Sequence, residues 1–200
     1  RSDGHAVEDL TTDGIAARYP FLRADCIGDA FALRPGGVLL ARRIVAMLAR
    51  LLAARGVTIE RARAVAADPA RAALTLDGGS RREADVLVLA AGPWGSRLSP
   101  ALAARVRPTR QVVVRLAPPP EHAAAWTVAP MLLDIAADDG FYAVPPVAGT
   151  PLKIGDHRFA PTADPDGPRE VTPAEAEALR RLARPRARDG QPYRRNSAPA

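Results

Sequence analysis

Lys153, Gly155 and His157 stand at alternate positions in the segment PLKIGDHRF. Alternate residues of an extended strand share a face, so the three side chains are expected to point together. Of the 28 lysine and arginine residues, only Lys153 is a lysine, which indicates a place where a compact, titratable ammonium is preferred to a planar guanidinium. Gly155 leaves room for a ring or a substrate to lie against the strand. The pattern predicts a catalytic site at Lys153 and His157; the alternative is one lysine retained by chance in an arginine-rich chain.

An antiparallel sheet is predicted to carry this strand. Four short strand-like runs lie from Arg107 onward, namely RPTRQVVVRLAPPP, APMLLDIA, GFYAVPPV and PLKIGDHRF, and their prolines favour edges and bends. Thr172 is the expected N-cap of a helix over TPAEAEALRRLA. Residues 106–184 are therefore predicted to form one domain, and residues 185–200, which have almost no apolar pattern, a disordered tail.

The first half of the chain has the pattern of an α/β domain over residues 1–105. Apolar residues at helical spacing predict a helix over 38–54, which Gly56 ends. VTIERARAVAA predicts a strand, and Asp77-Gly78-Gly79 predicts a hairpin turn. The continuous apolar run from Val86 to Ala91 is typical of a buried parallel strand.

Composition argues against several classes of protein. The net charge of +6 is spread over scattered arginines, which does not favour nucleic-acid binding. Cys26 is the single cysteine, so neither an internal disulfide nor a cysteine-based metal cluster is expected, and we predict no metal site. No apolar run approaches 18 residues and no signal-peptide pattern is present, so we expect a cytoplasmic protein without a membrane segment. Because the chain starts at Arg1 and not at Met, we expect an internal piece of a longer protein.

The helix, the Gly56-Val57 strand, the hairpin and the strand ending in AAGPWG together resemble FAD-dependent amine oxidases of the D-amino-acid oxidase superfamily. The resemblance implies α/β plus antiparallel β: part of a Rossmann-like FAD-binding domain joined to part of a mixed-sheet substrate domain. It places Val65 near the adenine and Ala91, Gly92 and Trp94 near the cofactor, because small residues let the backbone approach a dinucleotide. The alternative is that Gly92 only turns the chain and Trp94 only fills a core.

The second half is similar to monomeric sarcosine oxidase and N-methyltryptophan oxidase, members of the same superfamily. The lysine, histidine and tyrosine of that pattern fall on Lys153, His157 and Tyr142. The resemblance implies oxidation of a secondary or N-methylated amine by FAD and O2, giving an imine and hydrogen peroxide. Lys153 would supply positive charge for the reaction with O2, and His157 and Tyr142 would line the substrate side. A tyrosine in a half-buried strand is equally often a core residue.

The sequence departs from the superfamily pattern in its phosphate-binding part. No Gly-x-Gly-x-x-Gly is present, and no cysteine follows the lysine strand to bond a flavin covalently. We therefore expect an internal fragment that does not hold FAD by itself. Two alternatives stay open: a non-catalytic remnant or interaction module, and a related D-amino-acid oxidase or a dehydrogenase that passes electrons elsewhere. The sequence leaves the amine and the oligomeric state undetermined.

Overall fold

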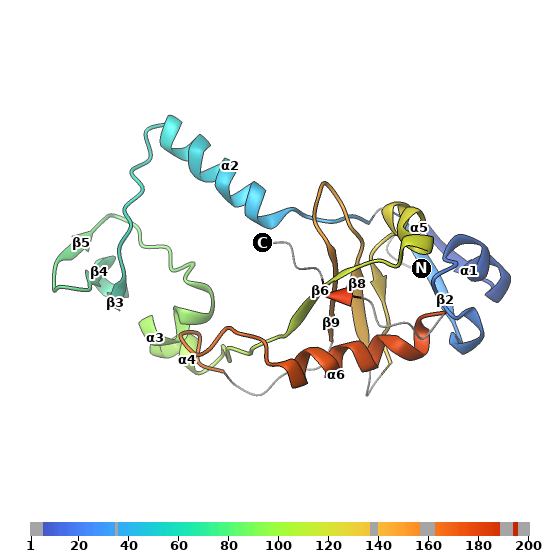
Figure 1. The fold of residues 1–200 in the computed structure, drawn as a ribbon. Coiled ribbons are helices and arrows are strands. Elements are labelled where there is room, and N and C mark those ends of the chain that lie inside the picture. The colour runs from blue at the N-terminus through green and yellow to red at the C-terminus, as the bar shows by residue number, and fades with distance from the viewer. Residues whose placement is uncertain (1–5, 35, 137–139, 157–162, 189–193, 196–200) are drawn as a thin grey trace. The chain divides into compact units, whose positions relative to one another are not determined.

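The computed structural model describes residues 6–34, 36–136, 140–156, 163–188 and 194–195 (Figure 1). The chain divides into two compact units. Unit 1 comprises Arg1–Val38, Gln111–Phe159 and Arg169–Ala200, and unit 2 comprises Leu39–Arg110 and Ala160–Pro168. The division differs from the expected ranges 1–105 and 106–184 in placing the first 38 residues with the second half of the chain.

A five-stranded antiparallel sheet forms the centre of unit 1. Its strand order is β10-β6-β9-β8-β7, and every pair is antiparallel. The strands are β6 (Val113–Ala117), β7 (Leu132–Leu133), β8 (Phe141–Val144), β9 (Leu152–Asp156) and β10 (Arg194–Arg195). The antiparallel sheet predicted for the second half of the chain is confirmed.

One face of this sheet is packed against the core of unit 1. The buried residues of this core face alternate along their strands, as a half-covered sheet requires: Val114, Leu116, Phe141, Ala143, Leu152 and Ile154. Helix α6 (Pro173–Ala183) packs against β6 and β9 through the buried Leu179 and Ala183. Phe21 stacks on Trp126 of helix α5 (Ala123–Val128), with ring centroids 3.9 Å apart.

The beginning of the chain and residues 185–188 complete unit 1. Strands β1 (Ala6–Leu10) and β2 (Ala30–Arg34) pair antiparallel, and between them helix α1 (Thr12–Arg18) is capped by the Thr11 side chain. Residues 185–188 differ from the expected disordered tail. Ala187 is buried, and the backbone N–H of Arg188 donates to the carbonyl of Phe21 at 3.1 Å. Disorder was expected because the stretch is poor in apolar residues, but backbone pairing with residues 21–23 does not depend on side-chain polarity.

Unit 2 contains helix α2 and a small antiparallel sheet. The sheet order is β3-β4-β5, formed by β3 (Ala64–Asp68), β4 (Ala73–Leu76) and β5 (Arg81–Glu83). Helix α2 (Ala41–Ala54) is followed by Gly56 at φ 82°, a left-handed value that confirms the predicted glycine at its end. The turn at residues 77–79 also forms, with Gly78 and Gly79 at positive φ. Two short helices follow, α3 (Gly95–Leu98) and α4 (Pro100–Ala103).

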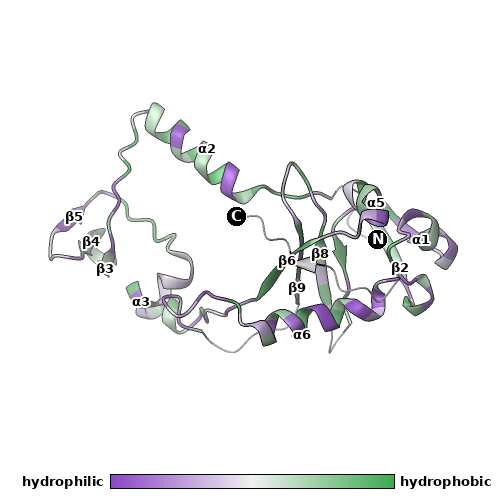
Figure 2. Ribbon diagram, viewed as in Figure 1, coloured by the Kyte–Doolittle hydropathy of each residue, from purple (hydrophilic) through white to green (hydrophobic). Residues whose placement is uncertain are grey.

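The predicted parallel strand from Val86 to Ala91 is wrong for this structure. Those residues form no strand, and Val86 and Val88 are 74% and 79% exposed. A central parallel strand needs parallel neighbours for its backbone hydrogen bonds, and the described sheets contain only antiparallel pairs. The hydrophobic residues along α2 (Figure 2) are likewise exposed, for example Met47 at 61%.

Candidate functional site

Strand β9 places Lys153 on the face of the sheet opposite the core. Leu152 and Ile154 are buried on the core face, so Lys153 and Gly155 share the other one, as the alternation predicts. We call this second surface the Lys153 face; it carries Val113, Arg115, Tyr142, Val144, Lys153 and Gly155. The Lys153 side chain is half-buried there.

Tyr142 lies directly opposite Gly155 in the β8–β9 register. A Cβ built on Gly155 would lie 2.5 Å from Cζ and Oη of Tyr142 and 2.8 Å from its Cε1. The space above Gly155 that was expected to admit a ring or substrate is therefore filled by the Tyr142 ring. The Nζ of Lys153 lies 5.8 Å from the centroid of the same ring, within range of a cation–π interaction.

Electrostatics fix the protonation of Tyr142. Burial raises the pKa of its phenol above 10.0, and the negative charge of Asp156 raises it further. The phenol is therefore protonated at neutral pH. Lys153 and Tyr142 together present a cation beside a neutral hydroxyl.

One predicted residue of the site cannot be placed on this face, and one residue of the face was not predicted. His157 lies outside the described residues. Arg115, which sequence reasoning missed, is the direct neighbour of Lys153 across the β6–β9 pair. The available signal was an arginine inside the otherwise apolar strand VVRLA.

The residues predicted to contact the cofactor lie in unit 2. Val65 is on β3 and is 49% exposed. Ala91 precedes the turn Gly92–Trp94, in which Gly92 has φ 52° and open space where a Cβ would stand. Strand β3 packs against α3, the helix that follows Trp94 directly. The structure thus brings the strand of Val65 and the segment after the glycine turn together.

Trp94 takes part in a polar cluster that sequence reasoning missed. Its Nε1 donates to Oδ1 of Asp166 at 2.8 Å, and Asp166 also accepts from Arg97 and from Arg63. The hydrogen bond from Trp94, followed by that from Arg97, holds the pKa of Asp166 below its usual value. The cluster anchors the turn D-P-D-G, where the Asp166 N–H donates to Asp164 Oδ1 at 2.8 Å. This arrangement favours a structural role for Trp94.

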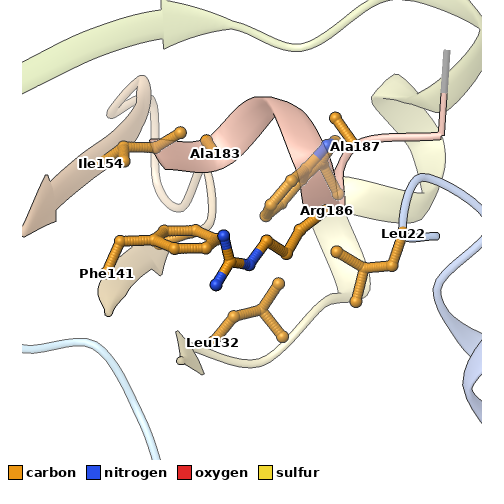
Figure 3. Close-up of a pocket in the computed structure, with 9 residues that line it drawn as sticks. Leu22, Leu132, Phe141, Ile154, Ala183, Arg186 and Ala187 are labelled. Atoms are coloured by element: carbon orange, nitrogen blue, oxygen red, sulfur yellow. The ribbon is translucent and has the colours of Figure 1, made fainter. Parts of the chain in front are cut away.

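A small cavity in unit 1 is the weaker candidate for a ligand site. It lies beside the core face, lined by Leu22, Phe141, Ile154 and Arg186 among others, and holds about 20 Å³ (Figure 3). Figure 3 shows the Arg186 guanidinium beside the Phe141 ring, at 5.9 Å from its centroid. Such a volume holds about one water molecule, whereas ligand pockets measure about 300–1,000 Å³. The Lys153 face is the better candidate.

Residues 1–193 match the family described as DAO, FAD dependent oxidoreductase. The chain belongs to this family. The match covers most of the sequence and confirms the resemblance to the D-amino-acid oxidase superfamily, whose cofactor is FAD. None of the described helices combines the length and apolar character needed to cross a bilayer, and no trio of His, Cys, Asp or Glu among the described residues is placed to hold a metal.

Solved structures of two oxidases share the fold. A modified fructosyl peptide oxidase from Aspergillus nidulans is 20% identical with a TM-score of 0.68, over 90% of this chain and 48% of that one. Glycine oxidase from Geobacillus kaustophilus is 23% identical with a TM-score of 0.68, over 97% of this chain and 50% of that one. The chain therefore spans about half the length of each structure. The predicted fold class, α/β plus antiparallel β, is confirmed. No curated protein sequence matches the chain.

Lys153 and Tyr142 fit the flavin ring system of FAD. The ammonium of Lys153 and the protonated phenol of Tyr142 suit the polar edge of a ring system that gains negative charge on reduction. The pyrophosphate requires backbone amides at a glycine-rich turn before a helix, and the sequence has no Gly-x-Gly-x-x-Gly. For the phosphate part of the cofactor, the described residues of this chain offer no glycine-rich turn of this kind.

Proposed function

We propose that this chain is the part of an FAD-dependent amine oxidase that carries the oxygen-reactive lysine. The reaction oxidises a secondary or N-methylated amino acid, similar to sarcosine, with O2. The amine loses one hydrogen from the carbon and one from the nitrogen of its C–N bond, which gives the imine. O2 takes up two electrons and two protons and becomes hydrogen peroxide. One observation carries the proposal: the single lysine of the sequence lies beside a protonated tyrosine on the sheet face opposite the core.

Each residue has a stated part in this proposal. Bound FAD supplies the two-electron redox chemistry. Lys153 holds a fixed positive charge that favours electron transfer to O2, and Tyr142 keeps its proton and positions the lysine through its ring. His157 lines the substrate side. The cofactor side consists of Val65, Ala91, Gly92 and Trp94, within the partial cofactor domain proposed for residues 1–105; residues 106–184 form the partial substrate domain.

Replacing the lysine tests the proposal. In a protein that contains this chain together with a Gly-x-Gly-x-x-Gly segment, Lys153→Met should leave anaerobic reduction by the amine largely intact. Reoxidation by O2 should slow by about two to three orders of magnitude, the scale of a lost charge about 4 Å away at an effective dielectric near 20. Lys153→Arg should restore part of the rate, because guanidinium keeps the charge but not the compact shape. Unchanged reoxidation in the methionine variant would refute the role of Lys153.

A control variant and a product assay accompany this test and distinguish an oxidase from a dehydrogenase. Arg107→Met removes an exposed cation of unit 2 and should leave both half-reactions unchanged. Hydrogen peroxide formed in proportion to amine consumed supports an oxidase. Turnover with an artificial electron acceptor but without peroxide supports a dehydrogenase.

A non-catalytic module is the second candidate. The missing phosphate-binding turn and the exposed Val86 and Val88 favour it, because this surface is not organised to hold a dinucleotide. Sequencing the flanking genomic DNA distinguishes the two candidates. An adjoining reading frame with Gly-x-Gly-x-x-Gly supports the oxidase, and its absence supports the module.

A further inference from the structure

Asp166 accepts hydrogen bonds from three side chains that stand at different elements of unit 2. The indole Nε1 of Trp94 donates to its Oδ1 at 2.8 Å, and Arg63, the residue before β3, donates to its Oδ2 at 3.3 Å. Arg97 of α3 donates to the same Oδ2. All four residues belong to unit 2. One carboxylate thus connects the start of β3, the turn before α3 and α3 itself.

A second carboxylate strengthens the attachment of α3. The other terminal nitrogen of Arg97 donates to Oδ1 of Asp164, so one planar guanidinium bridges two carboxylates. The same Oδ1 accepts from the backbone N–H of Asp166 at 2.8 Å, and the Asp164 carbonyl accepts from the N–H of Gly167 at 2.9 Å. These bonds within residues 164–167 hold the two carboxylates at a fixed spacing, as a support for α3 requires.

The turn Gly92–Trp94 depends on this support because little holds it from the preceding side. Residues 86–91 belong to none of the described strands. On the following side, α3 packs against β3, and the Trp94 indole is bound to Asp166. Gly92 itself is exposed, with φ 52° and open space where a Cβ would stand, so a ligand can approach its backbone closely. The conformation of this open backbone is therefore fixed mainly from the Trp94 side.

We propose that Asp166 is the positioning residue of the cofactor-side turn: its carboxylate holds the Trp94 indole and the Arg97 guanidinium, and thereby fixes the exposed backbone at Gly92. The indole then supports the turn, and the backbone of Gly92 meets the cofactor. This inference rests on the proposed oxidase function. The role requires a carboxylate, because an amide in its place offers one acceptor oxygen and turns two N–H donors toward the guanidinium groups.

The test compares Asp166→Asn with Glu60→Gln in this chain without flavin. Glu60 accepts from Arg82 at 2.9 and 3.1 Å, so its replacement breaks an exposed ion pair of unit 2 that involves neither the turn nor α3. Solvent exchange and backbone order are measured by NMR at pH 7. In Asp166→Asn the Trp94 indole N–H should exchange about three- to tenfold faster, and the order parameter of the Gly92 amide should fall from about 0.85 to below about 0.6.

The control variants separate positioning from general loss of stability. Both quantities should be unchanged in Glu60→Gln. Asp166→Glu, which keeps the charge, should recover part of the indole protection. Native amide signals from β4 verify that unit 2 of each variant is folded. Unchanged indole exchange at Trp94, or an unchanged order parameter at Gly92, in folded Asp166→Asn would overturn the assignment.

FAD binding supplies a second readout in a protein that joins this chain to a Gly-x-Gly-x-x-Gly segment. Titration of the apoprotein, followed by flavin fluorescence, should show FAD bound at least about fivefold more weakly in Asp166→Asn. Both half-reactions of the FAD-saturated variant should match the wild type, because Lys153 is untouched. Peroxide formation with equal FAD affinity in Asp166→Asn would refute the positioning role and leave the oxidase standing. Weaker FAD binding in that variant, without amine oxidation by the wild type, would refute the oxidase and leave the positioning role.

Discussion

Gly155→Ala is the sharpest probe of the Lys153 face. The added methyl carbon would lie 2.5 Å from Cζ and Oη of Tyr142, whereas carbon atoms in contact lie about 3.5–4.0 Å apart. The ring must therefore move by about 1 Å or leave its rotamer. Because the Tyr142 ring lies over Gly155 and 5.8 Å from the Nζ of Lys153, that movement also disturbs the cation–π contact.

The expected cost follows from two opposing effects. Overpacking of this kind costs about 1–3 kcal/mol. Replacing glycine by alanine also restricts the unfolded chain, which stabilises the protein by about 0.4–1 kcal/mol where the backbone permits it. The net loss should be about 1–2 kcal/mol, or roughly 2–8 °C in melting temperature for a chain of this size.

A double-mutant cycle with Tyr142→Ala isolates the contact. Urea unfolding of unit 1 is followed by Trp126 fluorescence in a Trp94→Phe background, since the sequence has two tryptophans. Gly155→Ala should be neutral or slightly stabilising once the ring is gone, giving a coupling of about 1–3 kcal/mol. Gly37→Ala, where a Cβ meets nothing within 4 Å, is the matched control and should cost nothing. The same loss from Gly155→Ala in both backgrounds would show that the Tyr142 ring does not fill this space.

Three further predictions concern other parts of the molecule. Trp94 and Arg97 lower the pKa of Asp166 in the folded state. The Asp166 carboxylate therefore stabilises the fold fully above its unfolded pKa of about 3.9, and this stabilisation is lost as pH falls through the lower folded pKa. Urea unfolding of unit 2 between pH 7 and pH 2 should show this pH dependence of stability in the wild type and not in Asp166→Asn. Thr172→Ala breaks the capping box with Glu175 and should lower the free energy of unfolding by about 1 kcal/mol, measured by urea midpoint and m-value. The chain mixed with FAD and passed through a desalting column should emerge without stoichiometric flavin absorbance, because no pyrophosphate turn is present; a yellow protein would contradict this.

Local elements were predictable because their causes lie within a few residues. Thr172 caps α6 and a left-handed Gly56 follows α2, as the sequence indicates. The alternation of the β9 strand predicted that Lys153 and Gly155 share a face, because the side-chain period of a strand is two. The antiparallel strands were also predictable, because turn residues separate the short apolar runs and reverse the chain between them.

What the sequence left open depends on contacts between distant segments. The run from Val86 to Ala91 has strand composition, yet its hydrogen-bonding state depends on neighbouring strands and not on its own residues. Residues 185–188 lack an apolar pattern but are ordered by backbone pairing with residues 21–23.

The sequence alone determined the family, the local helices and turns, and the side of the strand to which Lys153 belongs. Only the tertiary structure decided what surrounds that lysine. The register of β8 places Tyr142 over Gly155, and the register of β6 places Arg115 beside Lys153. A one-residue slip in either pair would move these side chains to the other face, and register is set by core burial across all the strands together.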